Sequence, residues 1–223
     1  MNAAKFLKLD LKVMKAQIKT MFLYPLTGLI MIVFLNSEAT FILGYMLFGF
    51  SVLATTPFSM DNAKSYSIFY YTLPAKTDSM VMGRFLLLFT GITSFGIMSV
   101  LLVLICIVKG GSVTGIHILY YTIFTSAMFI ISCLQYTMFY KVGVIKSQQF
   151  FTFIQMIPGM IIWLIMSFGN KYISEAGNHI QSVLVYGSRH LILAVLLELL
   201  PVSLVFFTCC HVSAAICRKK ELK

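Results

Sequence analysis

Six long apolar runs fix what this chain can fold into. A helix needs about 20 mostly apolar residues to cross a bilayer, and these runs reach or approach that length. They cover residues 21–35, 41–58, 85–108, 116–140, 150–168 and 191–217. Charged residues are only 11% of the chain and hydrophobic residues 59%, which leaves too little polar surface for a water-soluble domain. Because the runs are continuous and do not alternate, they favour helices over barrel strands. We predict an all-α integral membrane protein, with residues 1–223 forming one domain of six transmembrane helices.

The basic residues between the runs predict the orientation of the chain. Fourteen of the 17 Lys and Arg residues lie in the segments that share a side with the two termini. Basic segments stay in the cytoplasm, so we expect both termini there, in a bacterial cell membrane. The net charge of +10 is then explained by topology and anionic lipid, and no nucleic-acid partner is expected. The start of the chain, ending in Ser37-Glu38-Ala39, also resembles a cleavable signal peptide; its long, helically ordered basic segment favours an uncleaved chain.

Residues 1–19 carry a stripe of lysines on a predicted helix. At 100° per residue the lysines fall within an arc of about 80°, and apolar residues occupy most of the remaining surface, interrupted by Asp10 and Gln17. This pattern predicts an amphipathic helix in the cytoplasmic interface, with its apolar side in lipid and its lysines at the head groups. The stripe could also be only a topology signal. Its members are Lys5, Lys8, Lys12, Lys15 and Lys19.

Residues 59–84 form the longest predicted cytoplasmic loop, and this loop is unusually aromatic. Asp61 or Asn62 can cap a short helix that ends before Pro74. Thr77 or Asp78 can cap a second helix that continues into the third run. A short aromatic helix between two spans suits a groove on another protein, although an aromatic belt at the membrane surface fits the same composition. The candidate contact residues are Tyr66, Phe69, Tyr70, Tyr71, Leu73 and Pro74.

The end of this loop carries a family resemblance. Residues 71–86, YTLPAKTDSMVMGRFL, resemble the signature of ABC-2 type transporter permeases. In these permeases a leucine-proline pair and a short polar stretch precede an apolar segment, which ends in glycine, a basic residue and the third span. Small bacterial exporters of peptides and antimicrobials are most similar, for example the permeases that export staphylococcal phenol-soluble modulins. Larger members have an extended external domain, whereas this chain has only short external loops.

The resemblance implies partners and a role. The N-terminal amphipathic helix and the short coupling helix of the loop would contact a separate ABC nucleotide-binding subunit, which would bind ATP and Mg. A second copy or a homologous permease would complete the export path, and the cargo would be an amphipathic peptide of toxin or antimicrobial type. The sequence itself contains no G-x-x-x-x-G-K-[ST] loop, so we do not expect this chain to hydrolyse ATP. It shows no metal-ligand spacing and no nucleophile elbow, so no metal, cofactor or catalytic residue is expected in it.

Three polar residues at membrane depth are candidates for the translocation path or for a seam between permeases. They are Glu198, Gln135 and Gln155. An ionised carboxylate is costly in hydrocarbon, so Glu198 is expected to face the interior, a seam or a cavity, or to be protonated. The alternative is a structural pairing with Arg189 or His190. Residues 169–190 are too long for a tight turn and are predicted to lie outside the membrane as an external loop; the resemblance implies re-entrant or interfacial helices near the external gate at this position.

Two other functions remain open from the sequence. The chain could be a small-ligand-binding membrane module of an energy-coupling importer, or an immunity protein that sequesters a peptide without transporting it. The importer module would not need an aromatic cytoplasmic loop. Co-purification of an ATPase that depends on the aromatic loop would favour the exporter. Absence of the ATPase, with loss of small-ligand binding in a loop variant, would favour the importer module.

Overall fold

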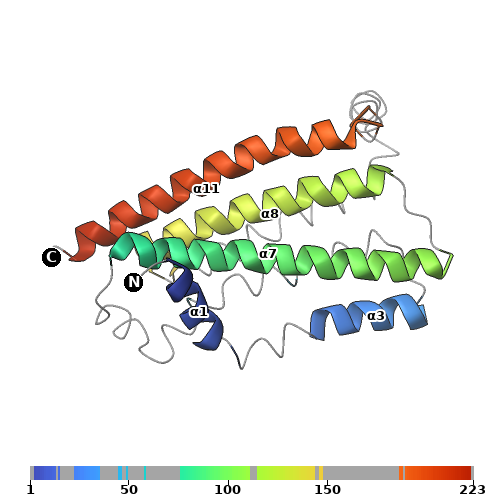
Figure 1. The fold of residues 1–223 in the computed structure, drawn as a ribbon, viewed down its shortest axis with the longest axis horizontal. Helices are drawn as coiled ribbons and strands as arrows, with labels where there is room; N and C mark the ends of the chain where they lie inside the picture. Colours follow the sequence, from blue (N-terminus) through green and yellow to red (C-terminus); the bar gives the residue numbers. More distant parts are fainter. Residues whose placement is uncertain are drawn as a thin grey trace.

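The computed structural model describes residues 3–13, 15, 23–35, 45–46, 49, 58, 76–110, 115–143, 146–147, 186–187 and 189–221. These residues form five helices, and within these ranges there is no strand. The helices are α1 (Ala3–Val13), α3 (Leu23–Leu35), α7 (Thr77–Val108), α8 (Gly115–Val142) and α11 (Leu191–Glu221). Figure 1 shows α3, α7, α8 and α11 side by side along one axis, with α1 lying across the start of α7.

Three of these helices are long and apolar enough to cross a membrane. The spanning stretches are Thr77–Val108, Tyr121–Val142 and Leu191–Lys219, and Leu23–Phe34 is a shorter apolar helix. The predicted runs 85–108, 116–140 and 191–217 each lie within one described helix, so these helix assignments are confirmed. The runs 41–58 and 150–168 fall almost wholly outside the described residues. Six spans therefore stays a prediction.

Helices α7 and α8 run in opposite directions. The ring of Phe85, near the start of α7, lies 5.5 Å from that of Tyr136, near the end of α8. Farther along α7, Phe89 lies 6.4 Å from Phe129, which comes earlier in α8. This is the relation expected for consecutive spans.

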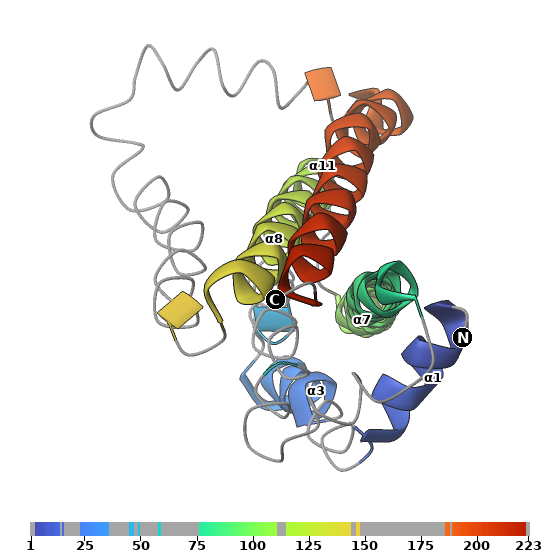
Figure 2. The same ribbon diagram turned by 90° about the vertical axis from the view of Figure 1, so that its left-hand side faces the viewer.

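Helices α8 and α11 lie side by side and run in the same direction (Figures 1 and 2). Ser126 of α8 contacts Glu198 of α11, and farther along both helices the hydroxyl of Ser213 donates to that of Thr137 at 3.2 Å. Spans four and six of a six-span chain cross in the same direction. The packing therefore agrees with the predicted order.

Helix α3 runs parallel to α7, as spans one and three of such a chain would. Tyr24 and Phe95 have ring centroids 6.4 Å apart. Beyond the end of α7, the ammonium of Lys109 donates to the carbonyl of Val33 at 2.9 Å and contacts that of Ile32 at 3.4 Å. A cation at a helix C-terminus is favourable because the last carbonyls lack helical partners.

Both chain termini lie at one end of the bundle (Figure 1). We call this the terminal end, where α1 and α7 begin and α8 and α11 finish, and the opposite end the distal end. Basic residues gather at the terminal end, whereas Lys109 and Arg189 lie at the distal end. This distribution agrees with the charge asymmetry that predicts the orientation. The basic residues at the terminal end include Lys5, Lys8, Lys12, Lys76, Lys141, Lys146, Arg218 and Lys219.

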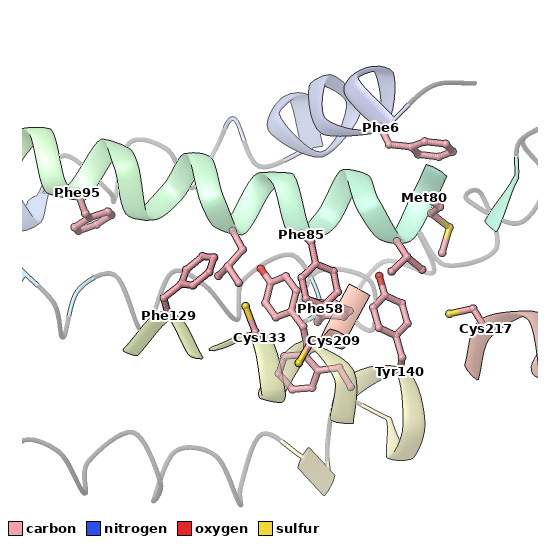
Figure 3. Packing of buried hydrophobic residues seen from close by; sticks show 14 of the residues in the cluster. Phe6, Phe58, Met80, Phe85, Phe95, Phe129, Cys133, Tyr140, Cys209 and Cys217 are labelled. Carbon is pink, nitrogen blue, oxygen red and sulfur yellow. The ribbon is translucent and has the colours of Figure 1, made fainter. Parts of the chain in front are cut away.

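The buried core is rich in aromatic residues, and Figure 3 shows Phe58, Phe85, Phe129 and Tyr140 gathered between α7 and α8. The ring of Phe58 lies 4.7 Å from that of Tyr136 and 4.6 Å from that of Phe139. Phe85 makes edge contacts with Tyr136 and with Phe206 of α11. Such aromatic pairs add about 0.5–1.5 kcal/mol beyond the area they bury. They hold the start of α7 against the end of α8 and the middle of α11.

Candidate functional site

Helix α1 packs against the beginning of α7 through one face. Phe6 and Asp10 lie one helical turn apart and expose only 1% and 3% of their surface. The lysine stripe lies on the opposite side of the helix, and the described members Lys5, Lys8, Lys12 and Lys15 are all exposed. The sequence-based expectation placed the apolar side of this helix in lipid. The structure instead buries Phe6 and Asp10 against protein.

Gly83 of α7 makes this close packing possible. A Cβ atom built at Gly83 would lie 2.6 Å from Cβ of Phe6 and 3.0 Å from the carbonyl oxygen of Ala3. Neither atom is the far end of a flexible side chain, so any larger residue would push α1 away from α7. The glycine of the signature is therefore a contact residue for the N-terminal helix.

Arg84 is buried next to this contact and exposes only 4% of its surface. Its guanidinium carbon lies 4.8 Å above the ring centre of Phe58, within the range of a cation–π interaction. Arg84 and Asp10 both interact electrostatically with Tyr136. Buried groups of opposite charge, one on α1 and one on α7, thus both act on one buried tyrosine of α8.

These residues form a unit that we call the α1–α7 junction. It joins three helices, because removing any member would loosen the contact between α1, α7 and α8. The unit also includes Phe58, the residue immediately before the loop 59–84, because the ring of Phe58 packs on that of Tyr136. Its members are Phe6, Asp10, Phe58, Gly83, Arg84 and Tyr136.

An ion pair links the start of α7 to the end of α11 at the same end of the bundle. The Nε and one terminal nitrogen of Arg218 donate to the two carboxylate oxygens of Asp78 at 2.8 and 2.5 Å. Asp78 lies in the first turn of α7 and Arg218 near the end of α11, where each charge interacts favourably with the dipole of its helix. The sequence-based expectation of a cap at Thr77 or Asp78 is wrong. The N-cap is Lys76 without a side-chain hydrogen bond, and the carboxylate of Asp78 is engaged by Arg218.

The predicted contact residues of the loop lie outside the described residues. This applies to Tyr66, Phe69, Tyr70, Tyr71, Leu73 and Pro74, and also to Lys19 and Gln155. Phe58 and Lys76, which flank most of the loop, are described and lie at the terminal end. For the residues outside the described part, the roles as ATPase contacts (the loop), interfacial anchor (Lys19) and path residue (Gln155) therefore stay predictions.

Glu198 faces α8 in the distal half of the bundle. The hydroxyl of Thr122 lies 3.4 Å from one of its carboxylate oxygens, and the hydroxyl of Ser126 lies 3.4 Å from the other. Glu198 is half-buried. The structure thus places this carboxylate between α8 and α11, and its polar contacts come from α8.

Gln135 lies in the core and exposes 1% of its surface. It directly precedes Tyr136 on α8, whereas Thr122 and Ser126, which contact Glu198, come about two to four turns earlier. Gln135 and Glu198 are therefore not brought together. Among the described residues, no three His, Cys, Asp or Glu side chains gather into a possible metal site.

Sequence reasoning missed three residues of the junction. Asp10 interrupts an apolar surface, and its four-residue spacing from Phe6 on the side opposite the lysines is the signal that it belongs to a buried face. Gly83 and Arg84 stand inside the signature that carries the resemblance. Their contact with α1 could not be read from the signature alone, because periodicity shows a face but not its neighbour.

One comparison with known proteins gives a match that covers nearly the whole chain. A family model described as ABC-2 family transporter protein matches residues 5–218. No curated protein and no solved structure matches the chain.

Proposed function

Because this chain belongs to the ABC-2 family of transporter proteins, and is thus a membrane permease component of an ABC transporter, we propose that it exports amphipathic peptides. The cargo would be of toxin or antimicrobial type. A separate nucleotide-binding subunit would supply ATP hydrolysis with its own Mg, and a second permease, identical or homologous, would complete the path. The ABC-2 family is the membrane component of such transporters and not the ATPase, so this chain needs no catalytic residue.

The observation that carries this proposal is the α1–α7 junction. A permease that does not bind ATP must receive force through a contact at its cytoplasmic face. Phe6, Asp10 and Arg84 are each at least 96% buried, so α1 and the start of α7 are held as one rigid unit. The loop 59–84 ends within this unit. Movement imposed on the loop would therefore reach α1 and α8 as well as α7.

The Asp78–Arg218 ion pair supports the same route to α11. It connects the first turn of α7 to the last turns of the helix that carries Glu198. We propose that the terminal end faces the cytoplasm and that the exposed lysines of α1 rest against anionic lipid head groups. Glu198, Gln135 and Gln155 remain our candidates for the path or the seam between permeases.

The test is co-purification of an ATPase with the permease. Truncation of aromatic interface anchors typically costs about 2 kcal/mol or more, so the double variant Phe69→Ala/Tyr70→Ala should lose the ATPase while its level in the membrane stays normal. A matched control is Phe34→Ala/Tyr186→Ala. It removes one Phe and one Tyr that are 77% and 64% exposed toward the distal end, and it should retain the ATPase.

Two results would contradict the proposal. If no ATPase co-purifies with the wild-type chain and the loop variant instead loses binding of a small ligand, the importer module is the better assignment. If the loop variant and the control lose the ATPase equally, the loop is not the contact.

A further inference from the structure

Glu198 lies well inside the membrane-spanning part of α11. It follows Leu191, the first residue of the helix, by about 10 Å along the axis at 1.5 Å per residue. Leu196, Leu197, Leu199 and Leu200 around it are all more than half exposed on the described bundle. The carboxylate is thus a charged group on an otherwise apolar helix, turned toward α8.

The hydrogen bonds to this carboxylate are long. O–H···O bonds are normally 2.5–3.0 Å, whereas the hydroxyls of Thr122 and Ser126 lie at 3.4 Å. The Thr122 hydroxyl has a single hydrogen to donate. Its oxygen lies 2.9 Å from the carbonyl oxygen of Leu119, so a hydrogen bond to this carbonyl is favoured over the longer one to Glu198. A carboxylate can accept about four hydrogen bonds, so Glu198 retains capacity for a stronger donor.

Within the part of the chain that the structure describes, no Lys or Arg lies at this depth. No Lys or Arg occurs in any of the six apolar runs, and a second copy would bring the same sequence. Arg189 precedes α11 and is exposed at the distal end, and Lys109 already donates to α3. An ionised carboxylate within a membrane is usually paired with a cation, and none of the described residues places a Lys or Arg side chain on Glu198.

The geometry points to Glu198, with Thr122 and Ser126, as a binding site for a cationic side chain, an ammonium or a guanidinium, of the transported peptide. This inference rests on the proposed export of amphipathic peptides and names the feature of the cargo that is recognised. The hydroxyls of α8 orient the carboxylate, and the cationic group supplies the short hydrogen bonds that they do not. The apolar surface of α11 around Glu198 would contact the apolar side of the same peptide.

The test compares two labelled peptides that differ only in charge. One is an amphipathic helical peptide with arginines along its polar face, and the other carries citrulline at each of these positions. Binding to the purified full-length permease is measured by fluorescence anisotropy in nanodiscs of phosphatidylcholine, which has no net charge to attract arginine. The wild-type chain should bind the arginine peptide at least about tenfold more tightly, because loss of one partner of a desolvated charge pair costs that much or more.

Variants assign this preference to one side chain. Glu198→Gln should abolish the preference and leave binding of the citrulline peptide unchanged, whereas Glu198→Asp should keep most of the preference. Glu221→Gln makes the same chemical change at the other end of α11 and should behave as wild type.

Several outcomes would overturn the inference. They are equal binding of both peptides by the wild-type chain, binding of neither, and a loss in Glu198→Gln that is equal for both peptides. A carboxyl group that is held protonated would give the first of these. No ATPase is needed in this assay, so failure of the cation site and failure of the ATPase-driven function are told apart.

Discussion

Asp10 and Arg84 at the terminal end expose 3% and 4% of their surface, while Glu198 in the distal half is only half-buried. The first two come from different helices, have opposite charges and share Tyr136 as a neighbour. Glu198 has two hydroxyl neighbours at 3.4 Å and no Lys or Arg within its span. The same membrane protein thus contains two buried opposite charges that act on one tyrosine and one half-buried carboxylate with only long hydrogen bonds.

The comparison suggests two roles for charged residues: Asp10 and Arg84 stabilise the fold, whereas Glu198 is available to bind a ligand. A compensated buried pair is costly to break, since removal of one partner strands the other. A weakly bonded carboxylate contributes little to folding and can be replaced at small cost. The variants below test this contrast, beginning with the largest expected effect.

Arg84→Met should destabilise the fold most. It removes a buried positive charge that acts on Tyr136 together with the negative charge of Asp10, and we expect a cost of about 3–5 kcal/mol in the free energy of unfolding, as for loss of one partner of a buried charge pair. Unfolding can be followed in detergent with a thiol-reactive dye, because Cys106, Cys133, Cys209 and Cys217 are buried and free. The double variant Asp10→Asn/Arg84→Met removes both charges and should recover much of the loss. A double variant as unstable as the sum of the single changes would show that the two charges do not compensate each other.

Gly83→Ala should have the next largest effect. Its new Cβ would lie 2.6 Å from Cβ of Phe6, and overpacking of this kind typically costs about 1–3 kcal/mol. Gly96→Ala is the matched control, because it lies in the same helix and nothing lies within 4 Å of its Cβ position. Limited proteolysis of the N-terminal segment measures the release of α1. Equal protection of α1 from proteolysis in both variants would show that the close contact between Gly83 and Phe6 does not hold α1 in place.

Asp78→Arg should destabilise the terminal end by up to about 1 kcal/mol, the range for a half-exposed ion pair. The measurement is thermal unfolding of this variant and of the charge-swapped Asp78→Arg/Arg218→Asp. The swapped pair should recover only part of the loss, because it restores the pairing but opposes both helix dipoles. No recovery in the swapped variant would show that the pairing itself contributes nothing.

Glu198→Gln should have the smallest effect on stability. Its two hydrogen bonds are long, and neutralising a carboxylate within the membrane removes a desolvation cost. We expect the free energy of unfolding to stay within about 1 kcal/mol of wild type or to rise. A loss as large as that of Arg84→Met would mean that Glu198 holds the bundle together, and the contrast between the two regions would fail.

Much of the helix layout could be predicted from the sequence. The runs 85–108, 116–140 and 191–217 correspond to α7, α8 and α11, because a continuous apolar stretch of this length has few other ways to satisfy its backbone. The terminal cluster of basic residues and the parallel relation of α8 and α11 also agree with the predicted topology.

The contacts of α1 could not be predicted in the same way. Periodicity places Phe6 and Asp10 opposite the lysines, but lipid and a protein neighbour are equally compatible with such a face. Only the spatial approach of α1 to Gly83 decides between them. The same limitation explains Asp78, whose position in the sequence fits a cap but whose partner, Arg218, lies far away in the chain.

The central claim is that the terminal end couples the ATPase while Glu198 recognises cargo. Its most direct test is ATPase activity of the permease–ATPase complex in nanodiscs, with and without the arginine peptide. Glu198→Gln should keep the ATPase bound and its basal activity normal but lose the stimulation by peptide. Gly83→Ala should still bind the peptide with its preference for arginine but fail to pass the signal to the ATPase. If both variants lose peptide binding and stimulation together, the two regions are not separate in function and the account is contradicted.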